Sequence, residues 1–266
     1  MCKPQEYGGD RMNLLAAFNE GLREHSLDVA RYCSKLVEAL RLERKHEESV
    51  FKIRLRECAY LAGLFHDTGK ALPSAQKRIA RHQGTPGHEV LSAIIAGRLL
   101  PLIGLSEQEI GLIVVSIVRH HQAIASLRER LNKLTQWVGE GRGTPRHSHQ
   151  TVSSDWEKAL AIIICEGLHE LNVKELNEAE IADVLRSLLS KQELSKRRLR
   201  ELLRRHYAYY DDLISQPQNR TLWFTARCLS GLLMLVDSYI ASIHRSNKRH
   251  STYLIEAQRL ITQYDL

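Results

Sequence analysis

The sequence predicts an all-α fold, and three observations support this prediction. Leu, Ala, Glu, Arg and Lys dominate the composition, while aromatic residues make up only 6% of the 266 residues. This mixture favours helices over sheets. Apolar residues recur at steps of three and four along almost the whole chain, which is the period of an amphipathic helix. There is no alternation of strand and helix patterns and no internal repeat, so we expect one main helical bundle.

The expected helices of the first half have recognisable starts and ends. Residues 25–40 carry one apolar stripe, and a second helix runs roughly over 50–66 and stops at HDTGK, where we expect Gly69 and then Pro73 to end it. A helix over 87–100 opens after Pro86-Gly87. The helix over 106–121 opens with a capping-box pattern, Ser106 with Glu109.

The second half begins with the clearest loop of the sequence, 139–154, which is rich in Gly, Ser, Thr and Pro. We expect a looser helical part beyond this loop, with an inserted subdomain around 170–215. Further helices are expected over 155–170, 178–190, 195–210, 219–245 and 249–264.

Composition indicates a protein of the cytoplasm. The five Cys have no CxxC spacing and are expected to be small core residues rather than disulfides or zinc ligands. We find no signal peptide at the N-terminus and expect no apolar segment long enough to span a membrane. The net charge of +7 suits a polyanionic partner, although many soluble proteins carry a similar surplus.

The stretch AYLAGLFHDTGKA, residues 59–71, combines a Gly-Lys pair with adjacent His66 and Asp67. A phosphate-binding loop requires G-x-x-x-x-G-K-[ST] between a strand and a helix. Here five residues separate Gly63 from Gly69, Ala71 replaces the hydroxyl residue, and the preceding residues have helical periodicity. The sequence therefore excludes a nucleotide loop of this type.

A metal site is the better interpretation of His66 and Asp67, since an imidazole and a carboxylate can bind one cation or two. Taken alone, the pair is better explained by a capped helix end with an exposed imidazole. Other residues change this balance, because Asp237 interrupts an otherwise apolar helix and a buried carboxylate needs a cation or strong donors. An ion pair with an arginine is the other explanation for Asp237. Further histidines lie at helix ends: His25, His88, His120 and His121.

The order H…HD…H…HH…D resembles the HD superfamily of metal-dependent phosphohydrolases, over about residues 20–245. Within it, the chain looks most like the CRISPR-associated HD nuclease of type I systems, a separate subunit in some of them. The local contexts that carry the resemblance are LREHSLDVA, LAGLFHDTGKA, GHEVLSA, VRHHQA and LVDSYIAS.

The resemblance implies an HD-domain helical bundle and a centre of two divalent metal ions. Residues 1–138 would form the N-terminal part of the HD domain, and the helices of 155–266 would complete it. One metal would be held by His25, His66, Asp67 and Asp237, and the other by His88, His120 and His121, with Asp67 bridging. Lys70 would contact the scissile phosphate. Imidazole-rich sites favour Mn, Fe, Co or Ni over Mg, although Mg at millimolar concentration stays an alternative.

The resemblance further implies a nuclease that hydrolyses phosphodiester bonds of single-stranded DNA, with RNA as a second substrate class. Its partners would be a separate helicase subunit and an RNA-guided CRISPR interference complex, which exposes a single strand. A phosphohydrolase acting on nucleotides or cyclic dinucleotides is the alternative, because the same scaffold serves both. A non-catalytic adaptor is the third reading, disfavoured because all seven ligand positions are filled.

A basic helix is the remaining candidate for nucleic-acid binding. In KRRLRELLRRH, residues 196–206, the residues Arg197, Arg200 and Arg204 share one face, and leucines face elsewhere. A solvated face of an amphipathic helix is the more ordinary explanation of this pattern, and a surface that contacts phosphates or docks the partner subunit is the functional one.

Overall fold

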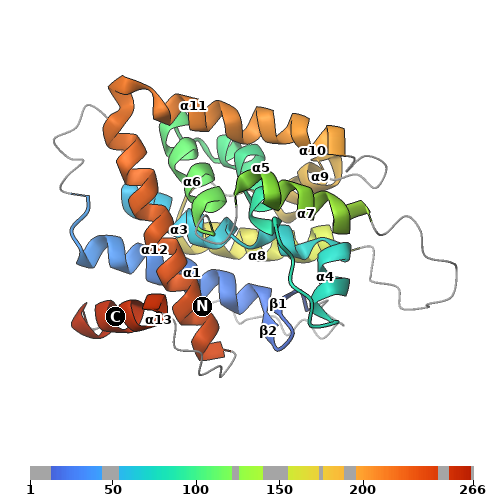
Figure 1. Cartoon of the computed structure of the whole chain (residues 1–266), viewed down its shortest axis with the longest axis horizontal. Helices are drawn as coiled ribbons and strands as arrows, with labels where there is room; N and C mark the ends of the chain where they lie inside the picture. Colours follow the sequence, from blue (N-terminus) through green and yellow to red (C-terminus); the bar gives the residue numbers. More distant parts are fainter. Residues whose placement is uncertain are drawn as a thin grey trace, which may run out of the picture.

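The structure, a computed structural model, describes residues 13–43, 54–121, 126–139, 155–173, 176–188, 196–244 and 252–264. Helices form nearly all of this part of the chain, as the sequence predicts (Figure 1). A two-stranded antiparallel sheet, β1 (Leu15–Ala17) and β2 (Glu20–Gly21), precedes them. The helices of the first half are α1 (Leu22–Ala39), α3 (Leu55–Phe65), η1 (Thr68–Ala71), α4 (Pro73–Ile79), α5 (His88–Leu99), η2 (Leu100–Ile103), α6 (Glu107–Arg119) and α7 (Leu127–Gly139).

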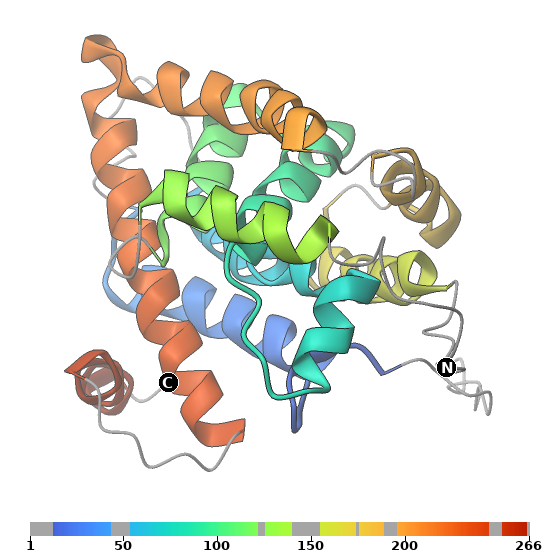
Figure 2. The same ribbon diagram turned by 45° about the vertical axis from the view of Figure 1, so that its right-hand side comes forward.

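The second half continues with helices close to the expected ranges. The first two are α8 (Trp156–Glu170) and α9 (Glu178–Leu188). The remaining elements are α10 (Lys196–Leu203), the π-helix η4 (Arg204–Ala208), α11 (Tyr209–Ser215), η5 (Pro217–Asn219), α12 (Arg220–His244) and α13 (Thr252–Tyr264). Figures 1 and 2 show α12 running along one side of the molecule, with α10 and α11 across one end. The predicted loop 139–154 lies outside the described residues except for Gly139, so the division of the chain at this loop stays a prediction.

The core places α1 directly against α3, and a glycine allows this close approach. A Cβ atom on Gly63 would lie 2.6 Å from the Cα of Ala30 and 2.7 Å from its backbone nitrogen. Any larger residue at position 63 would therefore push the two helices apart. The contact lies in the last turn of α3, so it fixes how the residues after α3 meet α1.

Gly69 has a different role from the one the sequence suggested. It does not end a helix in the left-handed conformation, since α3 ends at Phe65 and Gly69 lies within η1 with an ordinary φ. A Cβ atom on Gly69 would collide with the carbonyl oxygen of His88 and would come within 2.8 Å of the Cβ of Leu91. The glycine is needed because η1 packs directly against the start of α5.

Two helix starts are confirmed by the structure. α5 begins at His88 after Gly87, whose φ of 88° is in the left-handed region. α6 begins with the predicted capping box, in which the Ser106 hydroxyl accepts from the Glu109 backbone and the Glu109 carboxylate accepts from the Ser106 backbone. α6 ends at Arg119, so His120 and His121 follow its last turn, as expected.

Two expectations about apolar residues were wrong. The segment Pro217–His244 is long and apolar enough to cross a membrane by length and composition, with a mean hydropathy of 1.4. We interpret α12 as a core helix, because it packs against α1 and α6 through one buried stripe.

Cys33 and Cys58 are buried as predicted, but Cys228 is exposed on α12; no disulfide joins the described cysteines.

His206 in the π-helix η4 gives the fold a pH dependence. Burial, together with the nearby Arg98 and Arg205, lowers the pKa of His206 to about 4. In the unfolded chain this histidine takes up a proton near its ordinary pKa of about 6.5, whereas in the folded chain it does so only near pH 4. The contribution of the neutral ring to stability is therefore complete above about pH 6.5 and is lost as the pH falls below it. Between about pH 7 and pH 5, the wild type should lose about 1–2 kcal/mol more unfolding free energy than His206→Gln, measured by urea titration. Equal losses in the two proteins would contradict this role.

Candidate metal centre

The centre forms at the junction where α3 ends and η1 begins. His66 is the C-cap residue that follows Phe65 at the end of α3, and Asp67 precedes the first residue of η1. The change from α-helix to 3₁₀-helix at this point lets two consecutive side chains face the same space, which a continuous helix would separate by about 100°. The junction is held by the Thr68 hydroxyl, which donates to the carbonyl of Phe65 at 2.8 Å.

A first cluster gathers at this junction from α1, α3 and α12. Nε2 of His25 lies 3.2 Å from Nε2 of His66 and 3.2 Å from Oδ1 of Asp237. Nε2 of His66 lies 3.5 Å from Oδ2 of Asp67 and 3.7 Å from Oδ1 of Asp237. Four ligand-type atoms therefore converge on one point, although their residues span more than 200 positions of sequence.

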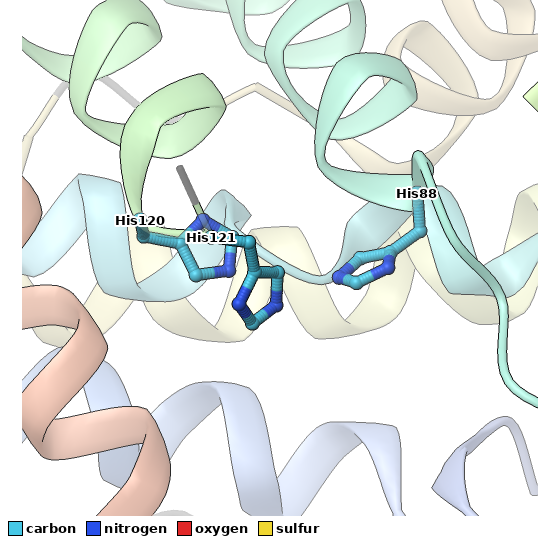
Figure 3. Close-up of side chains that lie close together, drawn as sticks. All are labelled: His88, His120 and His121. Atoms are coloured by element: carbon cyan, nitrogen blue, oxygen red, sulfur yellow. The ribbon is translucent and has the colours of Figure 1, made fainter. Parts of the chain in front are cut away.

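A second cluster consists of His88, His120 and His121. His120 and His121 extend from the end of α6 and His88 from the start of α5, and the three rings approach one another (Figure 3). One nitrogen from each ring lies within 4.8 Å of the others. This spacing is compatible with one cation held by three imidazoles.

Asp67 is the residue that joins the two clusters. Its Oδ2 lies 3.4 Å from Nε2 of His25, and its Oδ1 lies 2.9 Å from Nε2 of His88. The two carboxylate oxygens thus face different clusters, as a carboxylate does when it bridges two cations. All seven residues that the sequence singled out as ligands are brought together: His25, His66, Asp67, His88, His120, His121 and Asp237.

Hydrogen bonds orient most of the imidazoles with Nε2 toward the centre. Nδ1 of His66 donates to the carbonyl of Gly63 at 2.6 Å, and Nδ1 of His88 donates to that of Thr85 at 2.8 Å. His120 follows the same pattern toward Ile117. A proton fixed on Nδ1 leaves the lone pair of Nε2 available, which is the form in which imidazole binds a metal.

Buried imidazole nitrogens that lack a hydrogen-bond partner show whether this site fits a metal ion. Nε2 of His120 is buried and makes no hydrogen bond within the described part of the chain, and Nε2 of His88 is buried with Oδ1 of Asp67 at 2.9 Å but without hydrogen-bond geometry. Buried polar atoms normally have a partner, because desolvation without one costs about 1–3 kcal/mol. Two such nitrogens, both directed into one histidine cluster, fit a cation as the missing partner.

The protonation states of the side chains at the centre favour the binding of cations. Burial disfavours ionisation of Asp67, but Lys70, His66 and His88 outweigh burial and hold its pKa well below the usual range. The pKa of Asp237 is lowered in the same way by His25 and His66 against burial. Burial and the neighbouring histidines lower the pKa of His120 to about 4, so that ring is neutral at pH 7 and ready to bind a metal.

Sequence reasoning missed a network behind His25 that includes Glu20 and His244. Oε1 of Glu20 accepts from Nδ1 of His25 at 2.7 Å and lies 3.0 Å from Nδ1 of His244. Burial lowers the pKa of His25, but its bonds to Asp237 and Glu20 outweigh burial and raise that pKa to about 9. The only sequence signal was that His244 stands seven residues after Asp237, on the same face of α12.

Replacing Glu20 by glutamine should weaken metal binding about 10-fold, because a carboxylate behind a ligating histidine raises its basicity and fixes its orientation. The amide preserves the shape but removes the charge. Chelator competition with a coloured metal indicator measures the affinity, and Glu170→Gln, a change at a carboxylate bonded to Arg31 and Tyr60 instead, is the matched control. Equal affinities of Glu20→Gln and the control would show that the network has no such role.

Of the remaining candidate residues, Lys70 lies at the metal centre, whereas the arginines of the basic segment 196–206 do not. Nζ of Lys70 lies 2.6 Å from Oδ2 of Asp67, at the edge of the centre. Arg197, Arg200 and Arg204 are exposed, while Leu199 and Leu202 beside them are buried, as the pattern predicted. None of the three arginines belongs to either cluster; Arg200 lines a separate hollow with residues of α7. Binding of nucleic acid by these arginines therefore stays a prediction.

Comparisons with known proteins identify the family. Residues 22–206 match the HD domain family. The search of curated proteins found no match. Among solved structures, the CRISPR-associated Cas3 HD domain protein of Methanocaldococcus jannaschii is similar with 18% identity and a TM-score of 0.40, over 85% of this chain and 99% of that one. Since the family match covers most of the sequence, the chain belongs to the HD domain family and is a metal-dependent hydrolase.

Proposed function

We propose that the protein is a two-metal nuclease that hydrolyses phosphodiester bonds of single-stranded DNA, and of RNA as a second substrate. The observation that carries this proposal is the position of Asp67, whose two carboxylate oxygens face separate ligand clusters. A bridging carboxylate of this kind is suited to two cations about 3.5–4 Å apart, the arrangement of many phosphodiester hydrolases.

His25, His66, Asp67 and Asp237 would hold one cation, and His88, His120 and His121 the other, with Asp67 shared. When bound, the two cations supply Lewis acidity and make a hydroxide nucleophile available near neutral pH. The donor set of five imidazoles and two carboxylates favours Mn, Fe, Co or Ni over Mg.

The protein's own contribution to the reaction is charge and orientation. Asp67 and Asp237 stay ionised because of their cationic neighbours, and the hydrogen bonds of Nδ1 prevent the rings from turning. The side chain of Lys70 is 12% exposed, so its ammonium group reaches the edge of the centre. There it can donate a hydrogen bond to a non-bridging phosphate oxygen and stabilise the charge that develops on it.

The biological partners in this proposal come from the motif order in the sequence. A chain of this kind would work with a separate helicase subunit and an RNA-guided complex that exposes single-stranded DNA, in the cytoplasm. The net charge of +7 supports a polymeric, anionic substrate over a small one.

The test is hydrolysis by the full-length protein loaded with Mn²⁺ or Ni²⁺. Labelled single-stranded DNA, RNA of the same sequence, duplex DNA, mononucleotides and cyclic dinucleotides are compared as substrates. We expect cleavage of single strands and none by Asp67→Ala. Hydrolysis of nucleotides or cyclic dinucleotides without cleavage of any oligonucleotide would overturn the nuclease proposal and favour the phosphohydrolase alternative.

A further inference from the structure

A cavity of about 520 Å³ adjoins the metal centre. His88, His121 and Lys70 form part of its wall, so a molecule in this cavity would lie beside the metal ligands. The volume falls within the range of about 300–1,000 Å³ that is typical of small-molecule sites. The metal ligands themselves do not require a space of this size, which indicates room for part of a substrate.

Two aromatic rings of the cavity wall form a stacked pair. The centroids of Phe18 and His82 are 3.6 Å apart, and their planes differ by 29°. Both side chains are exposed, Phe18 to 45%. A single exposed apolar side chain is ordinary. A stacked pair that lines a cavity beside a catalytic centre is a platform on which another planar ring can stack.

The hairpin that carries Phe18 is held at a fixed position relative to Lys70. Phe18 lies in the turn between β1 and β2, and the side-chain amide of Gln76 bonds to β1 in both directions, accepting from the Leu15 nitrogen and donating to its carbonyl, each at 2.9 Å. The same amide donates to the carbonyl of Lys70 at 2.7 Å. One side chain thus ties the hairpin that carries Phe18 to η1, which carries the lysine.

The charge of the cavity wall suits an anion between these two features. Lys70, Arg130 and Lys133 contribute positive charge to it. Glu89 is the single acidic residue among the described residues of the wall, and its Oε1 already accepts from Nη1 of Arg130 at 2.8 Å. A planar ring attached to a phosphate matches this combination of an aromatic platform and surplus cations.

We propose that the cavity binds the nucleobase next to the scissile phosphate, with the base stacked on Phe18 and His82. This inference rests on the proposed function. Stacking uses the π-face that every base has, so the site should accept all four bases with little preference.

A fluorescence experiment tests the contact without depending on catalysis. The full-length protein, with Ca²⁺ in place of a transition metal, is titrated into a single-stranded oligonucleotide carrying one 2-aminopurine, placed in turn at each position. Stacking should quench the fluorescence at one position with the wild type and with Phe18→Tyr, but not with Phe18→Ala. Phe224→Ala, which removes a phenylalanine that is 61% exposed on α12 and outside the cavity, should behave as the wild type.

A kinetic experiment separates this inference from the proposed function. Phe18→Ala should lower kcat/KM for an oligonucleotide about 5- to 100-fold, mainly through KM, while its metal content stays unchanged. A second oligonucleotide has an abasic residue at the position where 2-aminopurine was quenched. Wild type and Phe18→Ala should cleave it equally slowly, because it lacks the nucleobase that would stack on Phe18.

The inference is overturned if Phe18→Ala matches Phe224→Ala on the intact oligonucleotide, or if the abasic residue leaves the effect of Phe18→Ala unchanged. Failure of the proposed function looks different, because the wild type then cleaves no oligonucleotide at all. In that case the fluorescence experiment still decides: quenching that depends on Phe18 supports a nucleobase site, and its absence rejects one.

Discussion

Replacing Asp67 by alanine is expected to lower hydrolysis by about 10³-fold or more, the largest effect of any single substitution in this chain. The carboxylate faces both ligand clusters, with 3.4 Å to Nε2 of His25 and 2.9 Å to Nε2 of His88. In the proposed two-metal centre, its removal would take one ligand from each cation at once. Metal analysis after dialysis should show a loss of bound metal together with the loss of activity.

A buried carboxylate elsewhere provides the control for this experiment. Glu109 bonds to Arg54 and to the start of α6, and its side chain is only 5% exposed. Glu109→Ala should reduce stability, because it removes the carboxylate that completes the capping box with Ser106 and pairs with Arg54, but should retain metal and activity in the folded protein. If Asp67→Ala keeps its metal and most of its activity while Glu109→Ala does not, Asp67 does not bridge two cations.

Replacing Lys70 by methionine is expected to lower kcat about 10²- to 10³-fold with little change in metal content. The ammonium group lies 2.6 Å from Asp67 and at the wall of the cavity, where it can stabilise charge on the phosphate in the transition state. Because that charge develops in the transition state, the effect should fall on kcat more than on KM. Steady-state kinetics on an oligonucleotide, with metal content measured in parallel, checks both points.

Two further variants define what Lys70 contributes. Lys77→Met removes an exposed lysine from the neighbouring helix α4 and should have no effect on kcat. Lys70→Arg keeps the positive charge and should recover a large part of the activity. A fall in metal content in Lys70→Met that matches its fall in rate would instead assign Lys70 to support of Asp67 alone.

The sequence was sufficient to predict the helical fold and to place the ligand-type residues. The helical period of the apolar residues is local, so it can be read without knowing the contacts between helices. His88, His120 and His121 stand at helix boundaries marked by Gly87 and by the end of an apolar stripe, and the structure has those boundaries. The seven residues come together because these helix ends and α12 meet in the core.

What the sequence did not reveal depends on contacts between distant segments. Glu20 reads as an ordinary charged residue before a helix, yet it is 3% exposed and bonded to His25. Gly69 reads as a helix terminator, whereas the close approach of α5 is the reason for it. Phe18 lies in a hairpin too short to show a strand period, and its stacking on His82 joins residues 64 positions apart. None of these contacts leaves a periodic signal.

The number and coupling of the bound metal ions test the central claim most directly. The full-length protein is titrated with Mn²⁺ and followed by electron paramagnetic resonance. A bridging carboxylate places two cations about 3.5–4 Å apart, so we predict two Mn²⁺ per chain and a spin-coupled spectrum at saturation, which Asp67→Ala abolishes. A single uncoupled Mn²⁺ at saturation, or a spectrum unchanged by Asp67→Ala, would contradict a centre of two cations joined by Asp67.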